Sequence, residues 1–575
     1  MRRRIWLLGG VAAAGLLLAA SAAATGPTAR THAVALDATP AAAPFAQAWA
    51  NVAKTVAARK ASSTLVFGME QDVSGFNTAL SCCSQFWAAV VGNTPEIRGA
   101  YVLDDKLRYL PDLATKVVAT TKTLTYYINP KAKWYWGGKS VPVTYKDFVY
   151  TWQQLINPKN DVASRDGYDQ ITGYTHKGAK VVSFKWKKPY ADYRELFGVV
   201  YPSAALQGTD FNKIWTDCVC GSDGQPVADG PFYLSNYTKG QGATLRVNPF
   251  WYGPKPSLKE VDFKLITDAN AEIQAMRGGE VDAIFPSPQA ALSQLRTVKG
   301  LTYSATAGLY QEHVDIQFGK KGQPLLKAPW MRHAIMMGID RGSLIKALYA
   351  GSAPGLKPLD SLLFYPNDVA NYKPDFSQWN YNPTKALALL RRHCTGGPSA
   401  PTAGNTSYFT CAGHPATFGY TTTAGSPRRE TSEAAFKAQL GAIGIQITDN
   451  LQPADVAFGP TVLQAGNYDL FEFGWSTLSD PAGFVPIWSC GGASNYLNYC
   501  NRKVTTLLDQ TNSQLDPVKR SRLFQRADVL LAKDLPSIPL YATPVILVHE
   551  STISGMTNNP STAGPTWNIY SWKWK

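Results

Sequence analysis

The sequence predicts an α/β fold, because short β-branched and aromatic segments alternate along the chain with segments of helical periodicity. Residues 65–68 are typical of a buried strand, and residues 143–156 space their apolar side chains as a helix does, behind the capping residue Thr144. A second helix is predicted over 268–277, since two glycines follow it directly. Further strands are expected over 124–128, 258–266 and 281–285, and further helices over 331–349, 384–392 and 431–443.

Residues 1–24 have the pattern of a secretory signal peptide. Three arginines precede an apolar stretch from Ile5 to Ala20, which is short for a membrane span, and small residues over 20–24 offer cleavage sites. An uncleaved membrane anchor is the alternative. We expect export to the periplasm or the cell surface, without a lipobox because no cysteine precedes Cys82. The alanine-rich residues 25–62 are expected to form a tether before the globular part.

The overall composition is that of a globular protein, with 45% hydrophobic and 17% charged residues. A net charge of +15 raises the question of a nucleic-acid or membrane partner. The Lys and Arg residues are dispersed, however, and no run of five or more basic residues or nucleic-acid-binding motif is present. We therefore expect a basic, solvated surface and no nucleic-acid partner.

Eight cysteines fall into close pairs along the chain, which fits an exported protein because disulfides persist outside the cell. Two pairs close short loops and are the predicted disulfides: Cys394 with Cys411, and Cys490 with Cys500.

The other four cysteines leave their pairing open. The adjacent Cys82 and Cys83 would bridge each other only with strain, so bonds from them to Cys218 and Cys220 are expected. The single residue between Cys218 and Cys220 is too short a spacing for a zinc knuckle, so no metal site is predicted.

Catalytic signatures are missing from the sequence. The tripeptide at residues 138–140 reads Gly-Lys-Ser, but Lys133 stands where a phosphate-binding loop needs glycine. There is no G-x-S-x-G elbow and no H-E-x-x-H motif, and the seven histidines are scattered. We therefore expect a protein that is not an enzyme and needs no cofactor.

Several blocks resemble, in order, the patterns of one protein family. Residues 134–148 are similar to a W-x-D-G-x-P-x-T-A-x-D-V pattern, with two glycines in place of the Asp-Gly turn. The blocks at 229–234 and 245–252 are similar to G-T-G-P-Y-x-L and R-N-P-x-Y-W, and residues 276–282 to L-x-x-G-E-V-D. Residues 328–341 and 381–390 are similar to D-x-R-V-R-x-A-I-x-x-A-I-D-R and Y-x-P-x-K-A-x-x-L-L.

Each block alone is weak, but together they make residues 63–575 resemble the family 5 extracellular solute-binding proteins of ABC importers, the oligopeptide, dipeptide and nickel type. The resemblance implies a two-lobed periplasmic-binding-protein clamshell of the large, three-subdomain type. Lobe I is expected over 63–306 with a subdomain inserted at about 106–227, lobe II over 307–541, and a return to lobe I over 542–575. Two crossovers, near 306–311 and Tyr541, would form the hinge. Solute would be captured between the lobes by a monomer and delivered to a membrane ABC permease.

The resemblance also implies ligand contacts. In peptide-binding relatives a carboxylate that follows a Gly-Trp pair holds the peptide ammonium, but Leu478 stands at that position here. Either Asp480, two residues on, takes this role, or amine recognition is absent. Relatives also face the ligand at the first crossover and after the first strand of lobe I. The candidate ligand contacts are Cys83, Ser84, Gln85, Tyr310, Gln311, Trp475, Ser476, Thr477 and Asp480.

The class of solute stays open. An oligopeptide is the first expectation, because peptides are the commonest ligands of the family. An oligosaccharide is the alternative, since the chain has aromatic residues to spare for a sugar site. A nickel complex or haem would require His or Cys between the lobes, where His313 is the candidate. An exported interaction or adhesion protein that keeps the fold but not the transport role is a third class.

Overall fold

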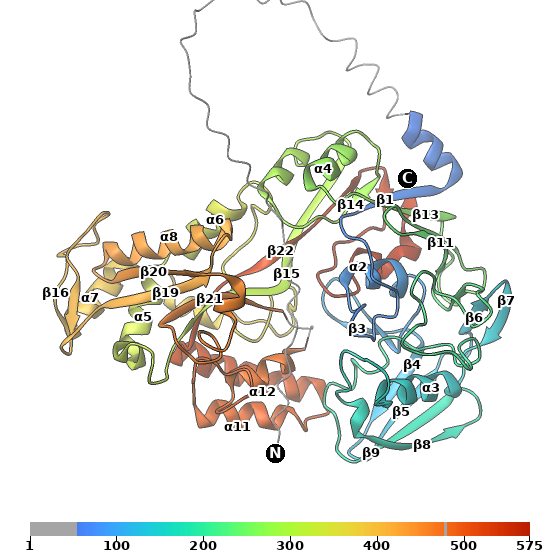
Figure 1. The fold of residues 1–575 in the computed structure, drawn as a ribbon, viewed down its shortest axis with the longest axis horizontal. Helices are drawn as coiled ribbons and strands as arrows, with labels where there is room; N and C mark the ends of the chain where they lie inside the picture. Colours follow the sequence, from blue (N-terminus) through green and yellow to red (C-terminus); the bar gives the residue numbers. More distant parts are fainter. Residues whose placement is uncertain (1–53, 477–479) are drawn as a thin grey trace, which may run out of the picture.

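The computed structural model describes residues 54–476 and 480–575 and shows two lobes that share one ten-stranded sheet (Figure 1). The sheet order is β11-β12-β13-β1-β14-β22-β15-β21-β19-β20. In lobe I the strands are β11 (Phe232–Thr238), β12 (Gly242–Val247), β13 (Glu260–Leu265), β1 (Thr64–Met69) and β14 (Ala283–Ile284). In lobe II they are β21 (Leu470–Ser476), β19 (Thr417–Thr423) and β20 (Gln446–Gln452).

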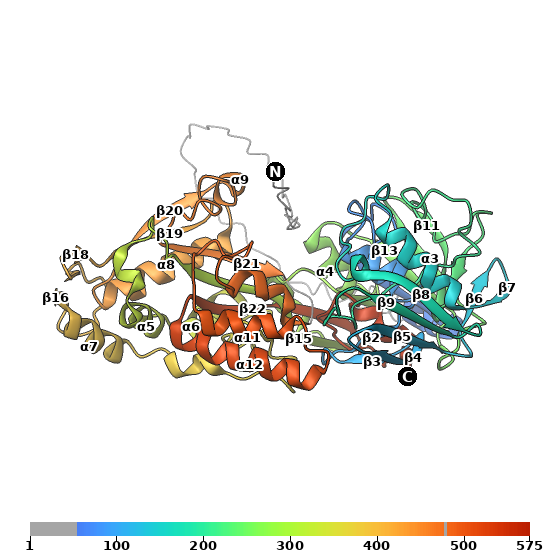
Figure 2. The ribbon, with the colours of Figure 1, turned by 90° about the horizontal axis from the view of Figure 1, so that it is seen from below.

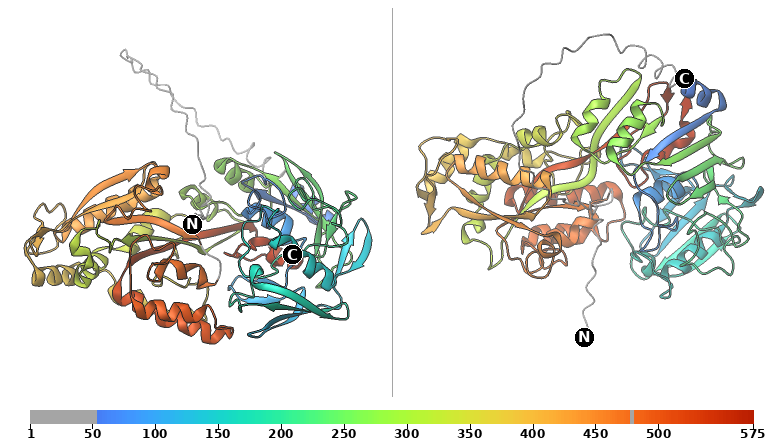
Figure 3. Two further views of the ribbon diagram at one scale, coloured as in Figure 1. Left: turned by 60° about the horizontal axis from the view of Figure 1, so that its bottom comes forward. Right: turned by 45° about the horizontal axis from the view of Figure 1, so that its top comes forward.

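Two long strands in the middle of the sheet, β15 (Leu301–Ile316) and β22 (Ser537–Glu550), run through both lobes, as Figures 2 and 3 show from other directions. They pair antiparallel, and their register shifts between Ala307 and Gln311. Gly308 lies in this bulge, where a Cβ atom would approach the carbonyl oxygen of Thr543 to 2.5 Å. The bulge therefore requires glycine at the point where the sheet passes from one lobe to the other.

A subdomain of lobe I contains the four-stranded sheet β4-β5-β9-β8. Helix α3 (Tyr145–Ile156) packs on it, with the Tyr126 and Phe148 rings 5.2 Å apart. Thr144 and Asp147 form the capping box that begins α3. The strands are β4 (Ala114–Ala119), β5 (Thr123–Ile128), β9 (Val181–Trp186) and β8 (Ile171–Lys177).

A hairpin of β6 (Lys133–Trp136) and β7 (Lys139–Pro142) stands beside this sheet and pairs with β10 (Val227–Ala228). Its two turn residues, Gly137 and Gly138, have φ angles of +53° and +85°. A turn with positive φ at both central positions matches the twist of a hairpin, which explains why two glycines replace the Asp-Gly of the family pattern.

Helices in lobe II pack around its part of the sheet. The predicted helix over 331–349 is two helices, α5 (Pro329–Gly338) and α6 (Arg341–Tyr349), because Ile339 is extended and Asp340 caps the second one. Arg341 is buried and satisfied, since it donates to the carbonyl oxygens of Leu359 and Pro539 and pairs with Asp360. The other long helices are α7 (Pro383–His393), α8 (Pro427–Ala442), α11 (Arg502–Thr511) and α12 (Pro517–Asp534).

Short elements complete the fold. The helical ones are α2 (Phe86–Ala88), α4 (Ala269–Arg277), α9 (Ala454–Ala457) and α10 (Val485–Trp488), and η1 (Ala89–Asn93), η2 (Tyr168–Gln170), η3 (Ala290–Leu295), η4 (Pro324–Lys327), η5 (Asp375–Trp379), η6 (Pro481–Phe484) and η7 (Pro565–Ser571). The strands are β2 (Tyr101–Leu103), β3 (Tyr109–Pro111), β16 (Cys394–Gly396), β17 (Phe409–Cys411), β18 (His414–Pro415), β23 (Ile553–Ser554) and β24 (Lys573–Trp574). No helix within the described ranges is both long and apolar enough to cross a bilayer.

Each lobe has its own hydrophobic core. The lobe I core extends without interruption from Phe67 on β1 to Phe184 on β9, so the subdomain shares it. A second core in lobe II surrounds Phe436 and Trp488. The end of the predicted tether is also structured, because residues 54–62 are helical and Arg59 pairs with Asp282 at 2.6 Å.

Disulfides join Cys394 to Cys411 and Cys490 to Cys500, as predicted. The expectation of bonds between the other two pairs is wrong: Cys82 bonds to its neighbour Cys83, and Cys218 to Cys220. Each of these pairs lies within one backbone turn. The Cys83 N–H donates to the Leu80 carbonyl oxygen, and the Trp215 indole donates to the carbonyl oxygen of Cys220. In each segment the turn itself brings the two sulfur atoms within bonding distance, so the bond stays within the segment.

One carboxyl group is buried in α4 without a partner. Glu272 is inaccessible to solvent, and neither of its oxygens accepts a hydrogen bond from any described residue. Burial, with a smaller contribution from Glu70, raises the pKa of Glu272 to about 8. The folded protein therefore holds a proton here that the unfolded chain releases near pH 4.3.

We predict that Glu272→Gln flattens the pH dependence of stability. Above about pH 4.3 the unfolded chain binds fewer protons than the folded protein does. The free energy of unfolding of the wild type therefore falls towards pH 8, by about 1.4 kcal/mol per pH unit for one group. The variant should gain about 2 kcal/mol relative to the wild type between pH 6 and pH 7.5 in urea unfolding curves. Glu280→Gln, at a surface ion pair with Lys264, is the control and should follow the wild type. If the free energy of unfolding of Glu272→Gln falls with pH in parallel with that of the wild type, the raised pKa of Glu272 is contradicted.

Candidate functional site

A charged cluster lies where β15 and β22 enter lobe II. We name it the crossover cluster: Tyr310 and Glu312 on β15, Arg428 and Arg429 at the start of α8, and Tyr541 on β22. Glu312 accepts from both arginines, from Arg428 Nη1 at 2.8 Å and from Arg429 Nε at 2.7 Å. The arginines follow β19, at the carboxyl end of a parallel strand, which is where α/β sheets bind ligands.

The crossover cluster carries excess positive charge. Burial alone would raise the pKa of Glu312, but Arg428 and Arg429 outweigh it and hold that pKa below its usual value. Burial and the neighbouring Glu312 raise the pKa of Glu472, which favours the protonated form of this second carboxyl group. Two guanidiniums therefore face one carboxylate. Arg428 is the more accessible of the two, with 29% of its side chain exposed, and can reach an anionic group of a ligand.

The Tyr310 ring packs against β21 at Gly474, which has no side chain. A Cβ atom on Gly474 would lie 2.1 Å from the Tyr310 ring. Arg429 Nη2 donates to the Tyr310 hydroxyl at 3.4 Å, which links the ring to the crossover cluster. The predicted contacts Gln311 and Trp475 pair directly across the two strands, and Gln311 is buried.

Aromatic rings surround Trp475. It stacks at an offset against His313, at 6.2 Å, and against Tyr496, at 6.5 Å. His313 is fully buried, with Nε2 3.3 Å from Asp315 Oδ1, so a bound solute does not reach it without rearrangement. Among residues 54–476 and 480–575, no group of three or more His, Cys, Asp or Glu side chains is placed to hold a metal ion.

A cavity of about 520 Å³ lies in lobe I, between the segment 78–112 and the subdomain. We name it the lobe I cavity. The predicted contacts Ser84 and Gln85 line it. Its charged groups include Arg98, which pairs with Asp112 at 2.5 Å, and Glu195, which accepts from the Tyr109 hydroxyl at 3.1 Å. The volume is in the range of small-molecule sites.

The two lobes meet at a third charged group, the junction cluster of Asp192, Asp480 and Arg520. Arg520 on α12 pairs with Asp192 of lobe I and, at 2.5 Å, with Asp480 Oδ2 of lobe II. The other oxygen of Asp480 accepts from the Ala482 N–H and caps the turn at 481–484. Both oxygens of the predicted ammonium ligand are thus engaged, and a solute ammonium would compete with Arg520 for Asp480.

The predicted contacts fall into separate groups. Tyr310, Gln311 and Trp475 are neighbours across β15 and β21, and Ser84 and Gln85 lie in the lobe I cavity. No hydrogen bond or ion pair between described residues joins these groups. Cys83 is buried in its disulfide, Ser476 ends β21, and Thr477 lies outside the described residues.

The residues that sequence reasoning missed are charged ones. Arg428 and Arg429 carried a usable signal, since they stand just before the helix predicted over 431–443, and the loop that leads into a helix is where α/β proteins bind ligands. Asp192, Glu195 and Arg520 carried none, because their meeting depends on the contact between lobes.

Comparisons with known proteins cover most of the chain. The family model for bacterial extracellular solute-binding proteins, family 5 Middle, matches residues 108–496. Di/tripeptide-binding protein 4 of Pseudomonas aeruginosa is 24% identical over 481 residues, 78% of this chain and 84% of the relative. Among solved structures, HbpA2 of Haemophilus parasuis has a TM-score of 0.73 at 17% identity, over 89% of this chain and all of its own. NikZ of Campylobacter jejuni, in complex with Ni(L-His), scores 0.63 at 18% identity, over 89% and 99%. These likenesses confirm the predicted two-lobed fold.

We predict that Gly474→Ala destabilises the lobe II site, because the added methyl group overlaps the Tyr310 ring. Overpacking of this kind lowers the free energy of unfolding by about 1–3 kcal/mol, which chemical denaturation will measure. Gly441→Ala is the matched control: it lies in α8 with open space around its Cβ position and should be neutral or slightly stabilising. Equal stability of the two variants would show that Tyr310 moves freely.

Proposed function

Because the chain belongs to the bacterial extracellular solute-binding proteins of family 5, the binding component of ABC importers, we propose that its solute is a peptide, bound between the two lobes and delivered to the membrane permease. Relatives of this family are binding proteins of transporters and not enzymes. The relative in Pseudomonas aeruginosa is named for di- and tripeptides, which supports a peptide for this chain.

The observation that carries the proposal is the excess positive charge of the crossover cluster. A peptide with a free C-terminus brings one carboxylate, and Arg428 is a guanidinium with an exposed face beside a buried Glu312 that already has a second partner. A bidentate pair between guanidinium and carboxylate is the strong form of such a contact. Tyr310 and Trp475 lie on the adjoining strands and would contact the peptide chain.

A metal chelate is the second candidate, on the same observation. NikZ binds Ni(L-His), a complex that also presents carboxylates, and Arg428 would serve such a ligand equally well. An oligosaccharide has no carboxylate to engage Arg428, so the cluster favours it less. A thermal-shift screen of the exported chain with peptides, Ni(L-His) and neutral oligosaccharides separates the three classes, since a ligand at a hundred times its Kd adds about 2.7 kcal/mol of stability.

We predict that Arg428→Ala weakens the binding of peptides with a free C-terminus by about 1.5–3 kcal/mol, the size of a charged hydrogen bond. Isothermal titration should show that the corresponding C-terminal amides bind the wild type and the variant alike, because they lack the carboxylate. Arg392→Ala, an exposed arginine on α7, should leave both affinities unchanged. If Arg428→Ala weakens the binding of the free-acid peptides and of their C-terminal amides equally, Arg428 does not bind the peptide C-terminus.

A further inference from the structure

The exposed side of helix α12 consists of cationic and aliphatic side chains alone. Its basic residues look dispersed in the sequence, but from Lys519 onwards the exposed positions follow one another at intervals of three or four residues, so the helix gathers them on one side. We name this surface the α12 face; its residues are Val518, Lys519, Arg522, Arg526, Val529 and Lys533.

The four cations of the α12 face have no counter-charge. No ion pair between described residues includes any of them, whereas exposed cations elsewhere are paired, as Lys437 is with Asp449. The acidic residues of this helix and its cap are engaged or turned away: Asp516 accepts from the first turn, Asp528 is buried, and Asp534 accepts from two side chains of lobe II. The face therefore presents positive charge to whatever approaches it.

Aliphatic side chains protrude at the same place. Among the described residues, three large hydrophobic side chains are more than half exposed: Val369 at 76%, Val518 at 61% and Val529 at 51%. Two of them lie on the α12 face. The third lies in a loop that packs beside this helix, since Gln525 Nε2 donates to the carbonyl oxygen of Asn371 at 2.8 Å. Single exposed valines need no explanation, but three gathered among cations mark an interaction surface.

A groove of about 460 Å³ lies between α11 and α12 at this face. Lys519, Arg522 and Arg526 line it together with polar side chains such as Gln510 and Ser513, and no acidic residue lines it. Guanidinium groups with neutral hydrogen-bond donors beside them are suited to a phosphate group, and the groove has room for its substituents.

We propose that the α12 face docks on an anionic membrane surface, with lipid phosphates at Arg522 and Arg526 and the exposed valines inserted among the headgroups. Basic residues interspersed with aliphatic ones on one side of a helix are typical of a segment that lies in the plane of a bilayer. A protein partner fits less well, because protein interfaces favour aromatic residues and disfavour lysine. A nucleic acid would use the cations but not the valines. The inference goes beyond the proposed function and does not depend on which solute is bound.

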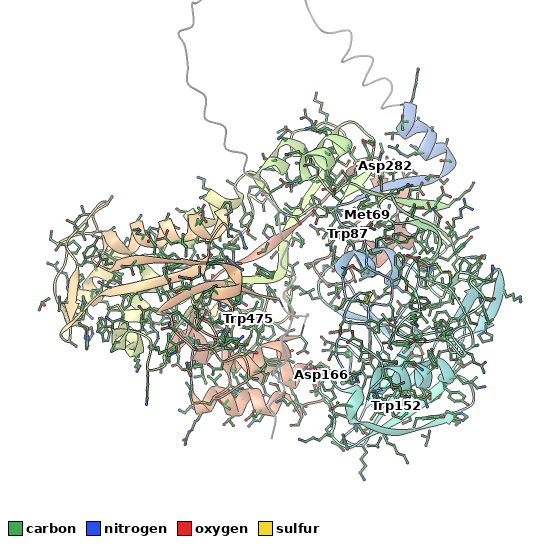
Figure 4. All side chains as sticks on the ribbon, in the orientation of Figure 1. Met69, Trp87, Trp152, Asp166, Asp282 and Trp475 are labelled. Atoms are coloured by element: carbon green, nitrogen blue, oxygen red, sulfur yellow. A yellow bond between two sulfur atoms is a disulfide. The ribbon has the colours of Figure 1, made fainter. Side chains whose placement is uncertain are left out.

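The position of the α12 face leaves the rest of the molecule free. Figure 2 shows α11 and α12 in the foreground of lobe II, and in Figure 4 their side chains extend from the lower edge of that lobe, away from Trp475. Arg520, on the inner side of α12, pairs with Asp192 and Asp480 at the junction of the lobes. One helix thus meets lobe I with its buried side and would meet the membrane with its exposed side.

Co-sedimentation of the exported chain with lipid vesicles tests the proposal. The wild type should bind vesicles of equal parts phosphatidylglycerol and phosphatidylcholine, and should not bind phosphatidylcholine alone. Arg522→Gln/Arg526→Gln should weaken binding on the order of thirtyfold, since each basic residue near an anionic surface contributes about fivefold. Val518→Ser/Val529→Ser should weaken it by about threefold or more at unchanged charge, because the aliphatic contact is lost.

A matched control changes the same charge on another helix of lobe II: Arg391→Gln/Arg392→Gln, at exposed positions of α7, should bind the mixed vesicles as the wild type does. Equal losses in the α7 and α12 variants would assign the binding to net charge and overturn the proposal, as would equal binding to both vesicle types or to neither.

Polyglutamate and duplex DNA serve as competing probes. If the wild type binds either of them as tightly as the mixed vesicles, and the valine substitutions change nothing, the face takes a soluble polyanion and the membrane is ruled out. Melting temperatures and solute affinities of all variants should match the wild type, because the α12 face is separate from the crossover cluster, and this agreement shows that a loss of vesicle binding is not one of folding.

Discussion

Two antiparallel strands hold this molecule together, because every other strand of the ten-stranded sheet reaches the opposite lobe through β15 and β22. The lobes therefore cannot move independently of the strands, and any change in their angle has to be taken up where the ladder of hydrogen bonds is interrupted. The ladder is interrupted at the bulge over 307–311, where Gly308 keeps the backbone close to Thr543, and again directly after it, between Glu312 and His313. Two long strands whose pairing is interrupted only over this short stretch give a two-lobed protein a hinge without a flexible linker.

The interior of lobe II places charge next to this hinge. Glu312 lies on β15 within five residues of the bulge, and its two arginines come from α8, so the packing of helix against strand depends on a buried ionic contact. Removal of Arg429, the more buried of the two partners, would be the more destructive change, since Glu312 would lose its buried counter-charge in a medium of low polarity. The more accessible Arg428 is thus available to a ligand, while the buried Arg429 holds α8 against β15.

Much of the fold followed from local patterns. The cap at Thr144 and the disulfides at Cys394 and Cys490 involve residues close in the chain, so their spacing was enough to predict them. The Gly137–Gly138 turn followed from the resemblance to the family pattern. The break between α5 and α6 was missed because the apolar periodicity continues across Ile339, and only the capping by Asp340 marks it. The junction cluster joins positions 192, 480 and 520, which no local pattern relates. The sequence identified Asp480 as a candidate ligand carboxylate, but it did not identify Arg520, which pairs with that carboxylate in the structure.

The disulfides between near neighbours have a consequence for how the chain matures. Eight cysteines can in principle pair in roughly a hundred ways. Cys82 and Cys83 are adjacent and one residue separates Cys218 from Cys220, so each pair can form within its own segment without the rest of the chain. Only four thiols then remain, all of them in the second half of the chain, and few incorrect pairings are left to them. Secretion of this protein should accordingly depend little on an isomerase to correct mispaired bonds.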